Sequence, residues 1–236
     1  MFILKQSDEG WLRDVYIESI DLCSMEEDMP QKSLLIIGAG GIGTTVVDLL
    51  VPALDRIALG AKITLMDGDT VEASNLGHQS YSRADIGGFK VDALADKWSH
   101  AEGLQMHSMP VNLRNFEQLD DFDLVVVCVD RPEPRRLVHS LDVPWVDLRC
   151  GGDGYVMLSS ESPPALVKQM TPDHPPMSCQ HPGALDDGNL EFGFAAAGAL
   201  GAQWALQHLR GNKPPVQAMG SLTYGEFEFP TAELSA

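Results

Sequence analysis

A glycine-rich turn in the first half of the chain has the spacing of a phosphate-binding element. The apolar run Leu34-Leu35-Ile36-Ile37 predicts a buried strand and leads directly into Gly38-Ala39-Gly40-Gly41-Ile42-Gly43, a G-x-G-x-x-G sequence opening a predicted helix. Glycines permit a tight bend, so that backbone N–H groups and the positive end of the helix dipole can face anionic oxygens. We therefore expect phosphate to bind at Gly38, Gly40, Gly41 and Gly43.

An acidic residue follows the next predicted strand. Segment 62–66 reads as a strand that delivers Asp67 at its carboxyl end, where a carboxylate can accept hydrogen bonds from a ribose. In the usual dinucleotide site the acid comes about 20 residues after the glycines, whereas Asp67 lies 29 residues after Gly38. The order of strand, turn, helix, strand and acid predicts a nucleotide site, and the spacing departs from the nicotinamide-binding pattern.

The residues after this acid resemble a known family. The stretch Asp67-Gly68-Asp69-Thr70-Val71-Glu72-Ala73-Ser74-Asn75-Leu76-Gly77-His78-Gln79 is similar to D-x-D-x-V-x-x-S-N-L-x-R-Q, a signature of the ThiF/MoeB superfamily. Ile86-Gly87-Gly88-Phe89-Lys90 is similar to the family's G-x-x-K, and Leu124–Asp130 to its strand ending in C-x-D. These are ATP-dependent activating enzymes of ubiquitin-like and sulfur-carrier proteins. A weaker similarity of segment order continues to about residue 228.

The resemblance implies roles for five residues at the nucleotide. Lys90 would contact the ATP phosphates and neutralise charge as an acyl-adenylate forms, and Asp130 would hold Mg²⁺, which prefers hard oxygen ligands. Asn75 would lie beside the phosphates, with Asp69 and Gln79 of the same loop also binding the nucleotide. The alternatives are a solvated lysine, an N-cap aspartate for the following helix, and amides that form ordinary turns.

His78 departs from the family pattern. The family has an arginine there that braces the triphosphate, whereas imidazole is shorter, lacks the bidentate fork and is only partly protonated near neutral pH. We expect His78 to lie at the nucleotide and to hold phosphate less strongly, unless another cation substitutes. Arg83, five residues further on, is the nearest candidate in sequence.

The resemblance places two more residues at the reaction itself. Arg13 resembles the N-terminal arginine that family dimers insert into the partner's ATP site, which predicts a homodimer, and a surface arginine is the alternative. Cys179 lies in a proline-rich loop near 159–188, where many relatives carry the cysteine that takes the carrier's C-terminus as a thioester. His174 or His181 could activate its thiol, and a structural cysteine is the alternative.

Alternating strand and helix patterns predict an α/β, Rossmann-like fold. Parallel strands joined by right-handed crossovers would form a mainly parallel, twisted sheet with helices on both faces. The alternating tail 221–229 predicts an antiparallel C-terminal edge strand, and Pro52 is expected to break the first helix. The predicted strands are 33–37, 62–66, 105–110, 124–129 and 145–148, and the predicted helices are 42–50, 53–58, 88–100, 115–119, 132–140 and 192–209.

The chain is long enough for one substantial domain. With 236 residues and 44% hydrophobic content, residues 33–236 are predicted to form a single ThiF-type adenylation domain with a crossover loop near 159–188. Residues 1–32 are predicted to be an appended helical segment, because Gly10 to Asp21 has helical spacing.

Composition narrows the cofactors and partners. The cysteines Cys23, Cys128, Cys150 and Cys179 form no C-x-x-C pair, so neither a disulfide framework nor zinc is expected. No apolar run reaches about 18 residues and the N-terminus lacks a basic segment before an apolar core, which predicts a cytoplasmic protein. A formal charge of −18 argues against nucleic acid and anionic membrane as partners.

The resemblance to the ThiF/MoeB superfamily implies an enzyme that uses ATP and Mg²⁺ to adenylate the C-terminal glycine of a small ubiquitin-fold or sulfur-carrier protein. A thioester at Cys179 could follow, or another protein could transfer sulfur. The main alternative is a non-catalytic member that binds nucleotide or a partner as a scaffold, for which His78 and the missing C-x-x-C pairs are the evidence. A nicotinamide oxidoreductase is a distant third.

Overall fold

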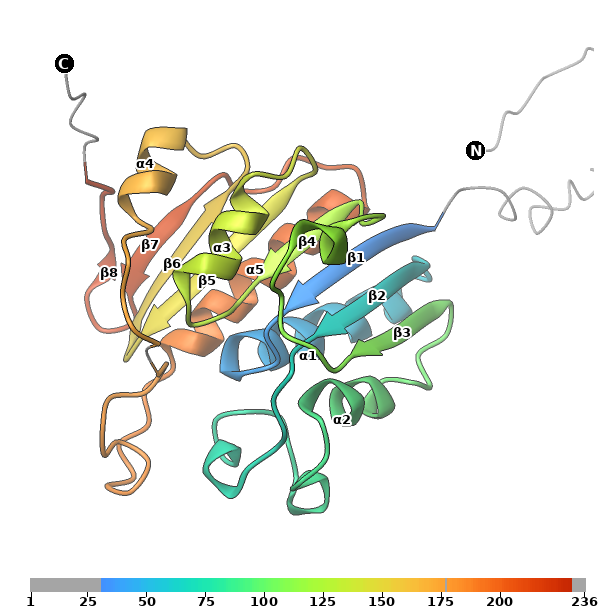
Figure 1. The fold of residues 1–236 in the computed structure, drawn as a ribbon, viewed down its shortest axis with the longest axis horizontal. Helices are drawn as coiled ribbons and strands as arrows, with labels where there is room; N and C mark the ends of the chain where they lie inside the picture. The colour runs from blue at the N-terminus through green and yellow to red at the C-terminus, as the bar shows by residue number, and fades with distance from the viewer. Residues whose placement is uncertain (1–30, 177, 231–236) are drawn as a thin grey trace, which may run out of the picture. The chain divides into compact units, whose positions relative to one another are not determined.

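A mixed sheet runs through the centre of the fold (Figure 1). The computed structural model describes residues 31–176 and 178–230, so Arg13 and the predicted helical segment 10–21 lie outside the described residues. Within that range the strands are β1 (Lys32–Ile37), β2 (Ala61–Met66), β3 (Leu104–Met109), β4 (Leu124–Val127), β5 (Trp145–Gly151), β6 (Gly154–Ser159), β7 (Ala218–Ser221) and β8 (Gly225–Glu226).

The strand order confirms the predicted Rossmann-like sheet. In the described part of the chain the order is β3-β2-β1-β4-β5-β6-β7-β8. The first five of these strands pair in parallel, and β5 to β8 pair antiparallel. Strands β2 and β3 lie on one side of β1 in the sheet, whereas β4, the next strand along the chain, lies on the other side of β1. The carboxyl ends of β1 and β4 therefore lie side by side, and a crevice at this edge is the usual ligand site of such sheets.

Helices cover both faces of the sheet, as predicted. Alternate strand residues such as Leu34 and Ile36 pack with α1, α2 and α5, while Leu35 and Ile37 pack on the other face with Val138 of α3. In Figure 1, α3 lies in front of the sheet and α5 behind it. A strand buried on both faces has to be apolar throughout, which explains the uninterrupted apolar runs of β1 and β4. The helices are α1 (Gly41–Arg56), α2 (Lys90–Lys97), α3 (Pro132–His139), α4 (Pro164–Gln169) and α5 (Gly193–Leu209), with 3-10 turns at Ala73–Asn75, Arg83–Asp85 and Phe116–Leu119.

The predicted break at Pro52 is wrong. Helix α1 continues through Pro52, which is exposed on its outer side. Val51 and Leu54 on either side of the proline are fully buried. Packing of these residues on the sheet holds the two halves of the helix in line and compensates for the backbone hydrogen bond that proline cannot donate.

The C-terminal half differs from the prediction in three places. Strand β6 was not predicted, although the Gly151-Gly152-Asp153-Gly154 run before it is a hairpin signal. The expected edge strand 221–229 is instead covered by two short strands, β7 and β8, joined by a turn over residues 222–224, after which Gly225 begins β8 with a φ of 85°. The proline-rich segment 159–188 contains helix α4.

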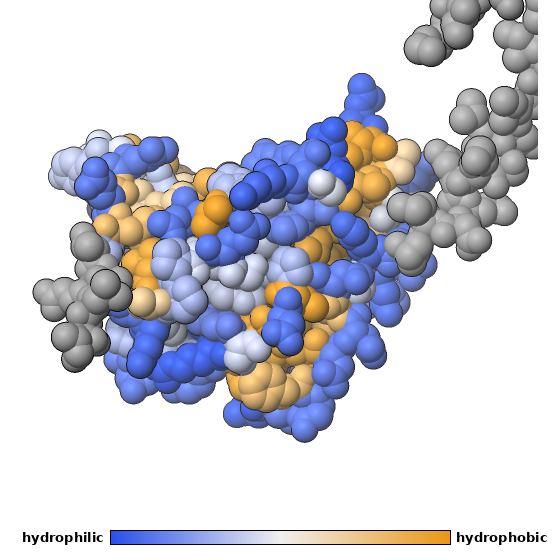
Figure 2. Space-filling view, turned by 90° about the horizontal axis from the view of Figure 1, so that it is seen from above, coloured by the Kyte–Doolittle hydropathy of each residue, from blue (hydrophilic) through white to orange (hydrophobic). Residues whose placement is uncertain are grey.

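The surface is mainly hydrophilic, with hydrophobic residues emerging in patches between charged ones on the face drawn in Figure 2. Hydrophobic residues scattered over a charged surface are ordinary for a folded domain. Among the described residues, none of the helices combines the length and apolar character that a membrane span requires.

Candidate functional site

A cavity of about 590 Å³ opens at the carboxyl ends of the parallel strands. Ile37 ends β1, Met66 ends β2 and Cys128 follows β4, and all three line it. The fold therefore brings together segments that lie far apart in the sequence. Of the predicted site residues, the cavity is lined by Gly38, Gly40, Gly41, Asp67, Asp69, His78, Gln79, Lys90, Asp130 and Cys179.

The glycine turn between β1 and α1 forms one wall of the cavity. Gly38 has a φ of 97°, and its N–H donates to the Met66 carbonyl at 2.8 Å, which ties the turn to β2. A Cβ atom on Gly43 would lie 1.8 Å from the Gly38 carbonyl oxygen, so this glycine is required for the helix to approach the turn. A Cβ on Gly40 would meet nothing within 4 Å. Gly40 borders the cavity, whereas Gly43 supports the turn from within the helix.

Asp67 holds this turn in place. Its Oδ2 accepts the Ala39 N–H at 2.7 Å and its Oδ1 accepts the Asp69 N–H at 2.8 Å. Burial raises the pKa of Asp67, while the two backbone donors and the Lys90 cation oppose that shift. Both oxygens are thus already engaged with backbone. The predicted ribose contact would have to use the lone pairs that remain.

Lys90 supplies a buried cation. It is the first residue of α2, its side chain is 9% exposed, and its Nζ lies 3.1 Å from Oδ2 of Asp69, whose side chain is 64% exposed. The Lys90 N–H also donates to the Asp69 carbonyl at 3.0 Å. Because its ion-pair partner is largely solvated, the ammonium group keeps positive potential available for an anionic ligand.

Asn75 does not line the large cavity. It borders an adjoining hollow of about 340 Å³ that shares Asp69 and Lys90 with the cavity. Its Oδ1 accepts the Glu72 N–H at 2.8 Å, which caps the 3-10 turn Ala73–Asn75. The Asn75 side-chain oxygen therefore stabilises a turn, as the alternative predicted. Asn75 shares the adjoining hollow with Lys90, and its predicted contact with phosphate stays a prediction.

His78 and Gln79 both line the cavity and carry unpaired polar atoms. His78 Nδ1 and Gln79 Oε1 are buried and make no hydrogen bond, while their Nε2 atoms lie 3.3 Å apart. Burial lowers the pKa of His78 and the nearby Lys90 cation lowers it further, so the ring is neutral at neutral pH. The imidazole thus does not replace the charge of the family's arginine.

Two arginines that the sequence reading missed border the same cavity. They are Arg114 and Arg131, whereas Arg83 is not among the lining residues. Arg114 follows β3 and Arg131 follows β4. Both arginines follow strands whose carboxyl ends meet at this edge, and this position could have indicated them. They lie far from His78 in the sequence, so neither was considered as a replacement for the family's arginine.

Asp130 borders the cavity just beyond β4 and is exposed. The N-cap of α3 is Arg131, which makes no side-chain capping bond, so the N-cap alternative for Asp130 does not apply. A solvent-facing carboxylate at a cavity rim can share a hard cation with phosphate oxygens and water. Within the described range no three His, Cys, Asp or Glu side chains are grouped to hold a metal by themselves.

Cys179 lines the cavity, and the side chain that interacts with its thiol is a second cysteine rather than a histidine. Interaction with the Cys150 thiol, near the end of β5, lowers the pKa of Cys179 against the effect of burial. His174 and His181 were the predicted activators, but neither borders the cavity. His174 Nδ1 lies 2.7 Å from the Pro175 carbonyl oxygen, and the largely exposed His181 has its Nε2 3.5 Å from Glu191 Oε2.

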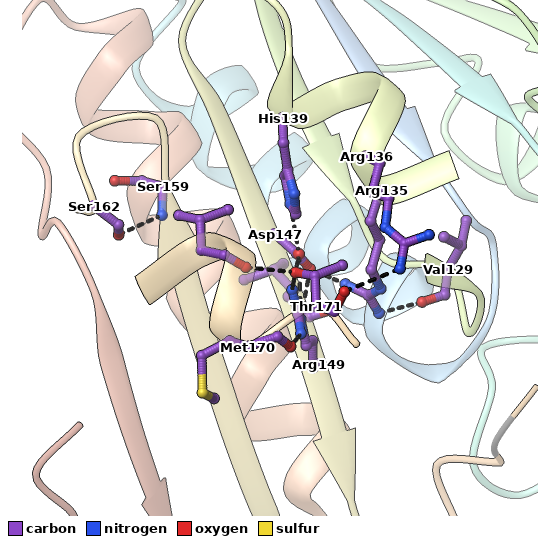
Figure 3. A network of polar contacts seen from close by, with 12 residues as sticks. Val129, Arg135, Arg136, His139, Asp147, Arg149, Ser159, Ser162, Met170 and Thr171 are labelled. Carbon is purple, nitrogen blue, oxygen red and sulfur yellow. Dashed lines mark hydrogen bonds and ion pairs between the residues drawn. The ribbon is translucent and has the colours of Figure 1, made fainter. Parts of the chain in front are cut away.

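A buried ionic cluster lies behind the cavity wall (Figure 3). Asp147 of β5 is fully buried and contacts Arg135, Arg149 and His139. Arg135 also donates to the carbonyls of Leu148, at 3.3 Å, and Val129. Because the Val129 carbonyl belongs to the segment that carries Asp130, Arg135 fixes this part of the cavity wall.

Charge within this cluster is asymmetric. Burial lowers the pKa of His139 to about 3, with Arg149 and Arg135 lowering it further, so the ring is neutral although its Nε2 lies 2.9 Å from the Asp147 carboxylate. One carboxylate therefore faces two guanidinium groups. The sequence did not indicate the cluster, because no spacing links Asp147 and Arg149 of β5 to the charged residues of α3.

Comparison with known proteins assigns the chain to a family. The ThiF family model matches residues 18–236. The chain belongs to the ThiF family. The adenylyltransferase and sulfurtransferase UBA4 of Scheffersomyces stipitis is 34% identical over 123 residues, covering 49% of this chain and 26% of UBA4. Ubiquitin-like modifier-activating enzyme 5 of Caenorhabditis elegans is 27% identical over 138 residues, covering 52% of this chain and 32% of that enzyme.

Solved structures share the fold of this ThiF-family chain. E. coli MccB with ATP superposes with a TM-score of 0.62 at 16% identity, covering 86% of this chain and 65% of MccB. PaaA gives the same TM-score at 19% identity, covering 84% of this chain and 64% of PaaA. The matches thus span about a quarter to a third of these two curated relatives and just under two thirds of the two solved chains.

Proposed function

We propose that this ThiF-family chain binds ATP in the large cavity and adenylates the C-terminal carboxylate of a small ubiquitin-fold or sulfur-carrier protein. The observation that carries this proposal is the convergence of the glycine turn, Lys90 and Asp130 on one cavity. Backbone N–H groups, a buried cation and a hard carboxylate are the groups that a triphosphate requires.

The reaction follows from where these groups lie. A carboxylate oxygen of the carrier's terminal glycine attacks the α-phosphorus, the bond to the bridging oxygen of the β-phosphate breaks, and acyl-adenylate and pyrophosphate result. Charge develops on the phosphate oxygens, where the turn amides and Lys90 stabilise it. Most of the catalysis is positioning, because Asp67 and Arg135 hold the two walls of the cavity in place.

Asp130 is the residue that we propose to hold Mg²⁺. Its exposed carboxylate at the rim provides one hard oxygen ligand, and phosphate oxygens and water would complete the shell. When bound there, the ion would neutralise charge on the phosphates. Arg114 and Arg131 border the same cavity and would add positive charge that the neutral His78 does not supply.

The names of the relatives support the proposed substrate class. UBA4 is named an adenylyltransferase and sulfurtransferase, and enzyme 5 is named for activating a ubiquitin-like modifier. MccB has been solved in complex with N-formylated MccA. A formal charge of −18 on this chain favours a carrier with a basic face. We also propose a homodimer, in which Arg13 would reach the partner's nucleotide.

One observation favours a second candidate, a non-catalytic nucleotide-binding scaffold. His78 is neutral where the family has an arginine, so ATP could bind without the charge needed for transfer. This candidate shares the ATP site and differs in turnover. A carrier-dependent reaction separates the two.

Calorimetry with ATP and Mg²⁺ tests the site. Lys90→Met should weaken binding at least tenfold, because a buried cation facing phosphate contributes roughly 1.5–3 kcal/mol. The matched control is Lys168→Met, since Lys168 is exposed on α4 away from the cavity lining. Equal affinities for ATP in the two variants would reject the assignment of the cavity.

A further inference from the structure

Two cysteines far apart in sequence meet at the edge of the cavity. Cys150 lies in β5 and Cys179 lies in the segment after α4. Their side chains interact, and both pack against the same apolar core. No C-x-x-C motif marks this pair in the sequence. The two cysteines come together only in the fold, where the segment after α4 returns to the end of β5.

The backbone around the pair keeps the two thiols together. The Gly152 N–H, two residues after Cys150, donates to the Cys179 carbonyl at 3.1 Å. The next residue, Gln180, is buried, and its amide bonds both backbone groups of Glu191 at 2.6 and 3.0 Å. The segment that carries Cys179 is therefore anchored on both β5 and the entry to α5.

We propose that Cys150 and Cys179 are a reversible disulfide site, oxidised by a small-molecule disulfide, that masks the cavity thiol. The inference that masking stops acyl transfer rests on the proposed function. The Cys179 thiolate attacks one sulfur of the small disulfide and releases one thiolate. The Cys150 thiolate then attacks Cys179 Sγ and releases the second thiolate. Two protein thiols are oxidised, one disulfide is reduced to two thiols, and two protons pass to the solvent or the leaving thiolates.

The order of attack follows from position. Cys179 borders the cavity and can be reached from it, whereas Cys150 is not among the lining residues. Interaction with the Cys150 thiol and the cation of Arg135 lower the pKa of Cys179, while burial and the Asp130 carboxylate raise it. Cys179 therefore reacts first with the small disulfide, and Cys150 resolves the mixed disulfide.

Cys128 is the third thiol near this point and serves as the control. It also borders the cavity, and burial raises the pKa of its thiol, as it does that of Cys150. It follows β4, and its N–H donates to the Ile37 carbonyl at 2.8 Å. No hydrogen bond joins it to Cys179 among the described residues. The geometry selects Cys150 as the partner.

The test uses the full chain with Cys23→Ser, incubated with oxidised glutathione, alkylated and analysed by peptide mass spectrometry. We expect a Cys150–Cys179 cross-linked peptide that dithiothreitol removes. Cys128→Ser should leave the cross-link unchanged. Cys150→Ser should leave Cys179 as a glutathione mixed disulfide. Alkylation of both thiols after oxidation, or a link from Cys179 to Cys128, would overturn the proposal.

Activity separates this inference from the proposed function. With a cognate carrier, oxidised protein should retain ATP-pyrophosphate exchange and lose the carrier thioester, and reduction should restore it. A thioester formed at full yield by cross-linked protein would refute the masking role. Absence of exchange in the reduced protein, with the cross-link still forming, would refute the proposed function and leave the disulfide site standing.

Discussion

Asp67 accepts the backbone N–H of Ala39 at 2.7 Å, and this bond joins the end of β2 to the glycine turn after β1. The acid that the sequence pattern assigns to a ribose therefore also orders the phosphate-binding turn. Its other oxygen accepts the Asp69 N–H at 2.8 Å, so one side chain positions the turn and the loop that leads to Lys90.

Replacing Asp67 tests this relationship. In Asp67→Asn, one of the two backbone N–H groups faces an NH₂ group instead of an acceptor, which costs about 1–3 kcal/mol. We expect weaker ATP binding and a lower free energy of unfolding in urea. Asp186→Asn, in an exposed loop, is the control. Wild-type values of both quantities in Asp67→Asn would show that the bond does not order the turn.

Alanine substitutions at two glycines of the turn should affect different properties, one thermal stability and the other ATP binding. Gly43→Ala places a methyl group 1.8 Å from a carbonyl oxygen and should lower the thermal midpoint by several degrees. Gly40→Ala meets no atom, so it should keep the midpoint and weaken ATP binding by intruding on the cavity. Thermal unfolding and calorimetry on both variants check this. The opposite pattern would contradict the assigned geometry.

His78 limits the positive charge of the cavity. Its lowered pKa keeps the ring neutral, so His78→Arg adds a permanent cation beside the phosphates. We expect ATP to bind roughly tenfold more tightly, about 1.4 kcal/mol, with little change for adenosine. Calorimetry at two salt concentrations measures this. Equal gains for ATP and adenosine would mean that the new side chain acts by packing and not by charge.

Acid should destabilise the fold through His139. Its folded pKa of about 3 lies below its unfolded value of 6.5, so the unfolded state binds more protons between these values. Stability is present above pH 6.5 and falls as the pH drops toward 3, by at most about 1.4 kcal/mol per pH unit. His139→Asn should flatten this slope between pH 6.5 and 4.5 in urea unfolding. An unchanged slope would reject His139 as the source.

The proposed dimer makes a further prediction. If Arg13 acts on the partner's nucleotide, Arg13→Ala and Lys90→Ala chains should each be inactive alone and recover part of the exchange activity when mixed, because the mixed dimer contains one intact site. Light scattering gives the mass in parallel. A monomer, or mixtures that stay inactive, would count against a trans arginine.

The fold was predictable because its signals are local. The apolar runs of β1 and β4, and the glycines between β1 and α1, each specify a short segment, and parallel pairing brings their ends together. The rule placed Asp130 at this edge, whereas Lys90 was assigned to the nucleotide by the family resemblance, and both line the cavity. Pro52 was misread because burial of Val51 and Leu54 outweighs the helix-breaking tendency of an exposed proline.

Contacts that depend on tertiary geometry were not predictable. Arg114 comes to the cavity across the sheet, and Arg135 meets Asp147 only when α3 packs on β5. Cys179 was read beside two histidines in sequence, whereas the fold brings Cys150 to it. Spacing along the chain contains no information on such partners.

Carrier-dependent pyrophosphate exchange tests the central claim most directly. Purified chain, ATP, Mg²⁺ and labelled pyrophosphate are mixed with a candidate ubiquitin-fold carrier, or with the same carrier lacking its terminal glycine. We predict label in ATP only with the intact carrier, loss of exchange in Lys90→Met and retention in Cys179→Ala, because adenylation needs the cation and not the thiol. No exchange with any carrier, while calorimetry shows ATP bound, would contradict adenylation and favour the non-catalytic scaffold.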